Sequence, residues 1–203
     1  MVTMEQIKEL RNATGAGVNA VKEALEISGG NTEAAIKYLR EKGVAKAEKR
    51  KDKIASNGIL GVYKHTNSKL LAIVEVACET DFAAKSPDMA KFADEIALHV
   101  AAIGPKYISV DTIDPSELET EKKVFEADLE GKPEEVKAKI MEGKLSKFYK
   151  DTVLLKQSLF SDESKLVEDY LNELIAKIGE KIVITRFFKV QLGEEFLTDQ
   201  VKL

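Results

Sequence analysis

The sequence contains no tryptophan, one cysteine and two histidines among its 203 residues. A single cysteine excludes an intrachain disulfide and is typical of a reducing compartment, although it leaves a metal thiolate or a catalytic thiol open. No stretch of the sequence approaches the roughly 20 consecutive apolar residues that a membrane-spanning helix requires. We therefore expect a cytoplasmic protein without membrane association.

An excess of positive charge is also missing. The chain has 31 basic and 35 acidic residues, for a net charge of −4. Because nucleic-acid binding relies on neutralising phosphates with Lys and Arg, this balance favours a protein partner and no direct nucleic-acid binding. What the sequence does have is 44% hydrophobic and 33% charged residues, which is typical of solvated helix faces over an aliphatic core.

The first 43 residues carry repeated signals for short helices. Thr3 and Gln6 have the spacing of a capping box, and Gly15-Ala16-Gly17 predicts the end of this first helix near Thr14. A second helix is expected to end at Gly29-Gly30 and a third at Gly43. The pattern predicts a three-helix domain over residues 1–43.

Residues 44–56 are rich in alanine and lysine and have little apolar periodicity. We interpret them as a solvated, partly helical linker between two domains. A phosphate-binding arm is the alternative, but a run of charge between domains is more often a soluble spacer.

The pattern then changes to strands. Residues 58–63 and 69–76 flank the turn formers Asn67 and Ser68, which predicts an antiparallel hairpin. Cys78 falls on the apolar face of the second strand, so it is expected to be a small buried hydrophobe. A final strand over residues 182–192 is expected to place Ile182, Ile184, Phe188, Val190 and Leu192 on one face, with Arg186 as the exception.

Helices are expected between these strands. Ser86 and Pro87 have the residue types of an N-cap and a first helical position, and Gly104-Pro105 ends that helix. Similar signals predict further helices at residues 115 to about 129, from Pro133 toward Met141, and from Leu166 to Gly179. The fold class is therefore α+β. Residues 57–203 are expected to form a core in which helices pack on one side of a three-stranded antiparallel sheet.

The sequence has few histidine and cysteine residues that could serve in catalysis or metal binding. His65 falls at the predicted hairpin turn and His99 on a helix, where structural roles are favoured over ligation. The sequence has no phosphate-binding loop, no dinucleotide-binding glycine motif and no paired-cysteine motif. We therefore predict no catalytic residues, no metal site and no enzymatic activity.

The segment Glu79-Thr80-Asp81-Phe82 lies between a buried strand and the start of a helix. A large aromatic residue at such a junction normally folds back into the core. From this segment alone, an ordinary turn with Phe82 as a core residue is the favoured interpretation.

Three motifs that follow one another as they do in a known family change the interpretation of this segment. Val76-Ala77-Cys78-Glu79-Thr80-Asp81-Phe82 closely resembles the signature of the elongation factor Ts family. Leu10-Arg11-Asn12-Ala13-Thr14-Gly15-Ala16-Gly17 is similar to the family's amino-terminal module, which has the fold of a ubiquitin-associated domain. Gly131-Lys132-Pro133 and Ile140-Met141-Glu142-Gly143-Lys144-Leu145 resemble its carboxy-terminal half. One departure is Ala83, where the family usually has Val.

The resemblance implies a guanine-nucleotide exchange factor that binds elongation factor Tu with GDP bound or without nucleotide. It implies that a turn displaces magnesium and disturbs the phosphate site of that partner, and that the exchange factor needs no cofactor itself. By residue matching, this turn consists of Thr80, Asp81, Phe82 and Ala83. The matching contacts of the amino-terminal module are Arg11, Gly15, Gly17, Val18 and Asn19, with helix packing as a competing role for Val18.

The resemblance is to the short form of the family, which implies a homodimer. A three-stranded sheet whose second face is left bare supports that expectation. Two other classes of function stay open at this point. An adaptor of the ubiquitin-associated type would use only the first three helices, and an RNA-associated factor would use the basic linker and lose affinity steeply with salt.

Overall fold

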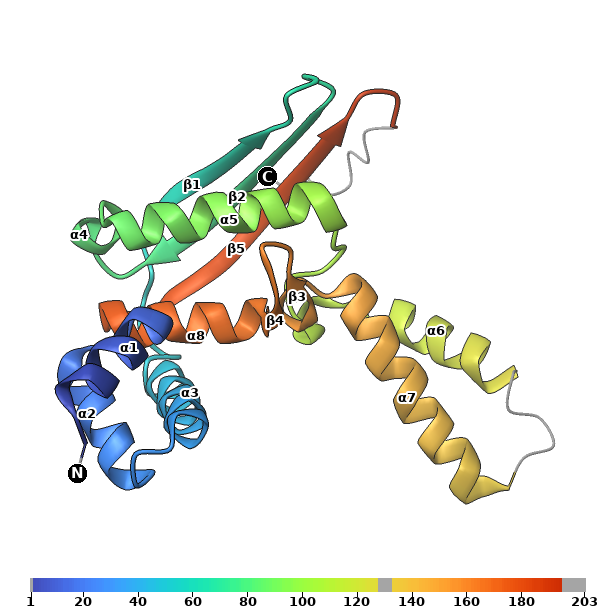
Figure 1. Ribbon diagram of the computed structural model, residues 1–203. Coiled ribbons are helices and arrows are strands. Elements are labelled where there is room, and N and C mark those ends of the chain that lie inside the picture. The colour runs from blue at the N-terminus through green and yellow to red at the C-terminus, as the bar shows by residue number, and fades with distance from the viewer. Residues whose placement is uncertain (1, 128–132, 195–203) are drawn as a thin grey trace.

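The computed structural model describes residues 2–127 and 133–194 of the chain. Its helices are α1 (Met4–Thr14), α2 (Val18–Ile27), α3 (Thr32–Lys49), α4 (Asp81–Ala84), α5 (Pro87–Ile103), α6 (Pro115–Ala127), α7 (Glu134–Thr152) and α8 (Val167–Ile178). Its strands are β1 (Asn57–Lys64), β2 (Leu70–Cys78), β3 (Ser158–Leu159), β4 (Asp162–Leu166) and β5 (Ile182–Gln191). The α+β class is confirmed, with β1, β2 and β5 forming a three-stranded antiparallel sheet (Figure 1).

The first three helices form a module with its own small core. The Thr3 side chain accepts a hydrogen bond from the Gln6 amide, and the Gln6 side chain accepts one from Thr3, so the capping box is confirmed. Gly15 ends α1 in the left-handed region at φ 67°, which a residue with a side chain rarely adopts. Leu10 and Leu25 lie in the core of this module. Its likeness to a ubiquitin-associated domain stays a prediction.

The prediction that the third helix ends at Gly43 is wrong, because α3 continues to Lys49. Gly43 is buried, and a Cβ at this position would lie 3.4 Å from the carbonyl oxygen of Asn172 in α8. This glycine therefore permits close helix packing and does not end the helix. The connection to β1 that lies outside the helix is shorter than expected, and α3 itself joins the module to the core.

The sheet has the order β1-β2-β5, so the hairpin strand β2 lies at its centre. Ser68 adopts φ 57° in the predicted turn between β1 and β2, and its amide donates to the His65 carbonyl. Gly61 of β1 lies directly against α5, where a Cβ would overlap the carbonyl group of Ala93. The absence of a side chain at Gly61 therefore sets how closely α5 approaches the sheet.

The predicted face pattern of the last strand is wrong beyond Ile184. A β-bulge shifts the register, so that Val76 pairs with Ile184 while Glu75 pairs with Arg186. Thr185 is thus an extra residue, and the alternation of side chains reverses after it. Phe187 packs against the core, whereas Phe188, opposite Ile73, lies on the outer face. Arg186 did not fit the predicted apolar face because the bulge at Thr185 places it on the outer face of the sheet.

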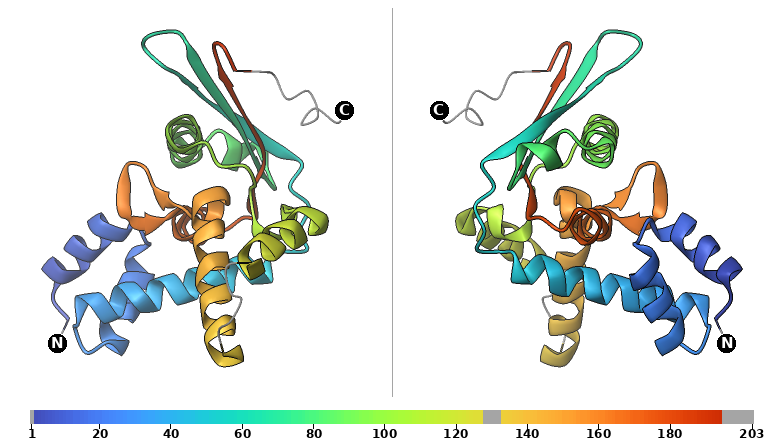
Figure 2. Two further views of the ribbon diagram at one scale, coloured as in Figure 1. Left: turned by 90° about the vertical axis from the view of Figure 1, so that its right-hand side faces the viewer. Right: turned by 90° about the vertical axis from the view of Figure 1, so that its left-hand side faces the viewer.

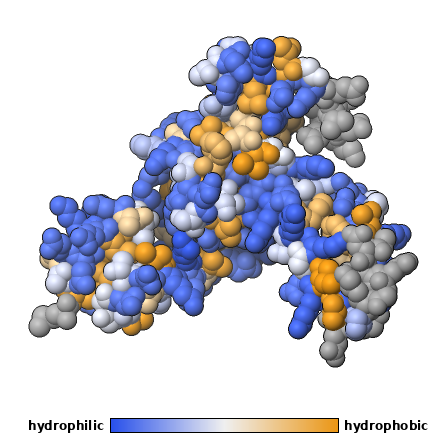
Figure 3. Space-filling view, turned by 45° about the vertical axis from the view of Figure 1, so that its right-hand side comes forward, coloured by the Kyte–Doolittle hydropathy of each residue, from blue (hydrophilic) through white to orange (hydrophobic). Residues whose placement is uncertain are grey.

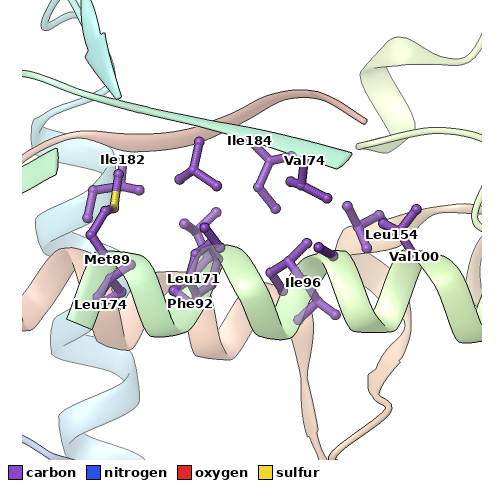
Figure 4. Packing of buried hydrophobic residues seen from close by; sticks show 14 of the residues in the cluster. Val74, Met89, Phe92, Ile96, Val100, Leu154, Leu171, Leu174, Ile182 and Ile184 are labelled. Atoms are coloured by element: carbon purple, nitrogen blue, oxygen red, sulfur yellow. The ribbon is translucent and has the colours of Figure 1, made fainter. Parts of the chain in front are cut away.

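The main core lies between one face of the sheet and the helices α5 and α8 (Figure 4). Val74 and Ile184 point from the sheet toward Phe92 and Ile96 of α5, and Leu171 contributes from α8. Cys78 is fully buried in this cluster, as predicted. Figure 2 shows α5 and α8 on the same side of the sheet.

The opposite face of the sheet carries apolar side chains that no helix of the described residues covers (Figure 2). Leu60 and Val62 are 59% and 51% exposed. The pairing register places Ile73 and Phe188 beside them, and all four belong to the outer face. Glu75 and Arg186 form an ion pair of 2.7 Å on this face.

Helices α6 and α7 form an antiparallel hairpin that projects from the body of the molecule (Figure 1). The predicted start of α7 after Pro133 is confirmed, but the helix extends well beyond Met141 to Thr152. The predicted end of the preceding helix near Leu129 lies outside the described residues. Figure 3 shows hydrophobic surface on this hairpin, yet no helix in the described ranges has the length and apolar character needed to cross a membrane.

Candidate functional site

Two groups that could support catalysis, Cys78 and His99, have structural roles. Burial raises the pKa of the Cys78 thiol, which disfavours the reactive thiolate. Its sulfur lies 3.1 Å from the Thr80 carbonyl oxygen. Within residues 2–127 and 133–194, His, Cys, Asp and Glu side chains form no group of three or more that could hold a metal ion.

His99 is fully buried and makes two hydrogen bonds. The amide of Phe160 donates to its Nδ1 at 3.1 Å, so the ring proton must lie on Nε2, which donates to Gln157 Oε1 at 2.8 Å. The ring thus joins α5 to the β3–β4 hairpin as a neutral imidazole. The structural role predicted for His99 is confirmed.

The stability of the protein is expected to fall as the pH decreases below about 6.5, because of His99. Burial lowers the pKa of His99 from its ordinary value of 6.5, so between the two pKa values the unfolded chain binds more protons than the folded chain. Urea denaturation between pH 5 and pH 8 measures this effect. His99→Asn is expected to flatten the slope below pH 6.5 and His65→Asn to preserve it, and equal slopes in both variants would contradict this assignment.

The segment singled out by its sequence forms an exposed turn at the end of the central strand. Thr80 is the N-cap of α4, and its Oγ1 accepts a hydrogen bond from the Ala83 amide at 3.3 Å. The Phe82 side chain is 83% exposed. The interpretation of Phe82 as a core residue is therefore wrong, and an aromatic ring projects into solvent from an otherwise well-packed junction.

Asp81 lies beside Phe82 on the exposed side of the turn. Lys85, one helical turn later, donates to Asp81 Oδ2 at 2.8 Å. This hydrogen bond and the charge of Lys85 hold the pKa of Asp81 below its ordinary value. The turn therefore presents an aromatic ring next to an ionised carboxylate.

Ala83 differs from its neighbours, because its side chain is only 5% exposed and belongs to the main core. Position 83 therefore packs beneath the turn, away from the exposed surface that Phe82 forms. Any contact of Ala83 with a partner would have to pass through its backbone or through the packing that supports Phe82.

Two acidic residues hold the turn in place: Glu79, which the sequence analysis named without giving it a role, and Glu180, which it did not name. Glu180, in the connection between α8 and β5, accepts hydrogen bonds from the Thr80 amide at 2.9 Å and from Thr80 Oγ1 at 2.7 Å. In return, Glu79 accepts a hydrogen bond from the Lys181 amide at 2.6 Å. No local signal reveals this arrangement, because the partners are about 100 residues apart in sequence.

The residues selected in the first module lie around the turn between α1 and α2. Arg11, Gly15, Gly17 and Asn19 are exposed, and Val18 is 45% exposed. Packing against neighbouring helices therefore buries only part of Val18, and the rest of this residue faces solvent. Gly17, Val18 and Asn19 also line a cavity of about 380 Å³ between this module and α8.

The end of α8 brings the two selected surfaces to the same side of the molecule. Lys177 forms an ion pair of 2.6 Å with Asp88 in the first turn of α5. The same Lys177 Nζ lies 4.0 Å from the position of a Cβ on Gly15. Glu180, three residues later, holds Thr80, so the end of α8 contacts the turn at Thr80 and lies near the α1–α2 turn (Figure 1).

The described residues form an α+β fold that presents an exposed aromatic ring beside an ionised carboxylate at the end of its central strand. The family model described as Elongation factor TS matches residues 3–174. The chain is 46% identical over 195 residues to elongation factor Ts of Geotalea uraniireducens (strain Rf4), covering 95% of this chain and 90% of that protein. It is 42% identical over 196 residues to elongation factor Ts of Thermosipho melanesiensis, covering 96% of this chain and 100% of that protein. The chain belongs to the elongation factor Ts family of translation factors.

Proposed function

We propose that this protein is a guanine-nucleotide exchange factor for elongation factor Tu. It binds elongation factor Tu with GDP bound, promotes release of GDP, and holds the nucleotide-free partner until a new nucleotide enters. Family membership supports the identity of the partner, and the 83% exposure of Phe82 is the observation that carries the mechanism. Aromatic side chains are enriched among the residues that contribute most to binding at protein–protein interfaces.

In the proposed mechanism, the turn of residues 80–82 acts as a wedge. Phe82 enters an apolar pocket of the partner's nucleotide-binding domain. Asp81 and the backbone at Thr80 then disturb the region that positions the magnesium ion and the phosphates of GDP. An ionised carboxylate is suited to this role because it repels phosphate and attracts the metal ion. Magnesium and nucleotide both belong to the partner, so the exchange factor itself needs no cofactor and catalyses no chemical reaction.

Thermodynamic linkage sets what the wedge must achieve. The factor weakens GDP binding by the same ratio by which GDP weakens binding of the factor. Burying one phenylalanine contributes about 1.5 to 3 kcal/mol, which corresponds to one to two powers of ten in affinity. The wedge therefore requires a second contact that holds the partner while nucleotide binding is weakened.

The exposed α1–α2 turn is the proposed second contact. Its members are Arg11, Gly15, Gly17, Val18 and Asn19. They lie on the same side of the molecule as α4 (Figure 1), so one partner could meet both surfaces. In this bipartite arrangement the first module supplies affinity and the wedge supplies the coupling to GDP. Such a partner places the site of action in the cytoplasm, where translation occurs.

Release of a fluorescent GDP analogue from elongation factor Tu tests this function. The unmodified chain is expected to accelerate release in a concentration-dependent manner when excess GDP traps the free partner. Val18→Asp is expected to raise the concentration of factor that gives half-maximal acceleration, because it places a charge on the apolar part of the second contact. No acceleration by the unmodified chain would refute the proposed function.

We further propose that the protein is a homodimer formed through the outer face of its sheet. Leu60, Val62, Ile73 and Phe188 form an apolar surface on three adjacent strands. A second copy of the chain would cover this surface with an identical one, as two-fold symmetric contacts do. Two three-stranded sheets facing each other would thereby complete a sandwich.

Val62→Lys is expected to convert this dimer into a monomer, because it buries an unpaired charge at the proposed contact. Val62 is already 51% exposed in the single chain, so the fold should tolerate the change. Light scattering is expected to give twice the mass of one chain for the unmodified protein and the mass of one chain for the variant. Val124→Lys, at a valine in α6 that is 58% exposed, should leave the mass unchanged. A monomeric unmodified protein would exclude the dimer.

A further inference from the structure

Glu79 and Glu180 form a reciprocal pair of contacts between two segments that are distant in sequence. Each carboxylate accepts the backbone amide of the other segment: Glu180 accepts from Thr80 at 2.9 Å, and Glu79 accepts from Lys181 at 2.6 Å. We call this arrangement of Glu79, Thr80, Glu180 and Lys181 the carboxylate clasp. It lies immediately beyond the pair formed by Cys78, the last residue of β2, and Ile182, the first residue of β5.

Glu180 fixes Thr80 through both of its hydrogen-bond donors. Thr80 Oγ1 donates to Glu180 Oε1 at 2.7 Å, which directs the hydroxyl hydrogen toward Glu180. A lone pair of the same oxygen is then available to accept from the Ala83 amide at 3.3 Å. Hydrogen bonds to an ionised carboxylate are shorter and stronger than neutral ones. Glu180 therefore sets the rotamer of Thr80, and through the N-cap it sets the direction in which α4 begins.

The other half of the clasp connects the turn to the end of α3. Arg50 Nη1 donates to Glu79 Oε1 at 2.8 Å, and Asn57 Nδ2 donates to the Glu79 carbonyl at 2.8 Å. The Lys181 amide and Arg50 keep the pKa of Glu79 below its ordinary value, so this carboxylate stays ionised. Lys181 Nζ donates to the carbonyl oxygens of Lys51 and Lys53, at 2.6 and 2.8 Å. The connection is therefore held to the core through the Arg50 side chain and through the backbone carbonyls of Lys51 and Lys53.

The clasp adds little to the apolar core. Glu180 is only partly buried, and the core in this region consists of apolar residues such as Met89, Ala84 and Ile182. What depends on Glu180 is the short helix α4, which has only four residues and cannot be stable by itself. Phe82 belongs to this helix and is 83% exposed, so packing of its own ring does not fix its position.

We propose that Glu180 is a positioning residue for nucleotide exchange: through Thr80 it holds Asp81 and Phe82 in the orientation that enters the partner. This inference rests on the proposed exchange function. A wedge that is ordered before binding avoids the entropy loss of being ordered during binding. Loss of Glu180 leaves the first module able to dock but makes insertion of the wedge less favourable.

Glu180→Gln tests this role with little change in shape. The variant is expected to lower the maximal rate of GDP release from elongation factor Tu about tenfold, since an amide cannot accept both Thr80 donors as a carboxylate does. The concentration of factor for half-maximal acceleration should change by no more than about twofold, because the α1–α2 turn is untouched. Glu163→Gln, at an exposed position in β4, is the matched control and should keep the unmodified rate.

A double-mutant cycle with Phe82→Ala separates positioning from general support of the fold. If Glu180 acts through the turn, Glu180→Gln should have little further effect once Phe82 has been removed. Additive losses, an unchanged maximal rate in Glu180→Gln, or a fall of more than about 5 °C in its melting temperature would each overturn the positioning role. If the unmodified chain failed to release GDP, the exchange function itself would be refuted and the positioning role with it. A normal unmodified chain with an unaffected variant would refute only the role of Glu180.

Discussion

Phe82→Ala is expected to slow the GDP release that the factor promotes by about 10- to 100-fold at subsaturating concentrations, while leaving the fold intact. The magnitude follows from the roughly 1.5 to 3 kcal/mol that burial of one phenylalanine in a partner contributes. Because the ring is 83% exposed in the free protein, its removal should change the free energy of unfolding by no more than about 0.5 kcal/mol. Stopped-flow release of a fluorescent GDP analogue and thermal melting measure the two quantities.

Phe160→Ala is the matched control for this experiment. Phe160 is 51% exposed and lies at the β3–β4 hairpin, and its contact with His99 uses its backbone amide, which alanine retains. With the Phe160→Ala variant, elongation factor Tu should release GDP at the same rate as with the unmodified factor. A full rate with Phe82→Ala would mean that the wedge is not the coupling element, even if the protein is an exchange factor. A large loss of stability in Phe82→Ala would show that the ring packs in solution.

Gly61→Ala is expected to destabilise the protein by about 3 kcal/mol or more, for a reason unrelated to the partner. The added Cβ would overlap the carbonyl group of Ala93 and lie 2.9 Å from the Ala93 Cβ, so α5 would have to move away from the sheet. That movement opens the core that α5 shares with Val74 and Ile184. For a chain of this size, the melting temperature should fall by about 6 to 12 °C.

Gly143→Ala, the same substitution at another position, is expected to raise the stability of the protein. Gly143 lies within α7, and a Cβ there would have no neighbour within 4 Å. Alanine has a higher helix propensity than glycine, so stability should rise by up to about 1 kcal/mol. Calorimetry or urea denaturation of both variants measures the difference. Equal stability of the two variants would show that α5 does not press on the sheet at Gly61.

Local signals in the sequence predicted most element boundaries correctly, because each depends on residues a few positions apart. Ser86 and Pro87 begin α5, and Gly104 ends it in the left-handed region at φ 70°. Gly179 ends α8 in the same way, at φ 81°. These assignments needed only capping geometry and conformational freedom of the backbone.

The incorrect predictions share a different cause. Gly43 has the sequence character of a helix stop, but it allows α3 to pack closely on α8, a helix more than 100 residues later in the chain. Thr185 is an extra residue only relative to its partner strand, so the bulge that reverses Phe187 and Phe188 depends on pairing with β2. No property of either segment by itself contains this information.

The candidate site shows the same division. The sequence by itself determined which residues form the turn, since Val76 to Phe82 carry the family signature, and it determined that the chain has little material for catalysis. Only the tertiary structure decided that Phe82 faces solvent while Ala83 faces the core, because adjacent residues of a helix point in directions about 100° apart. Only the tertiary structure brought Glu180 to Thr80. A hydrogen bond across about 100 residues has no local signature, because it exists only once β2 and β5 have paired.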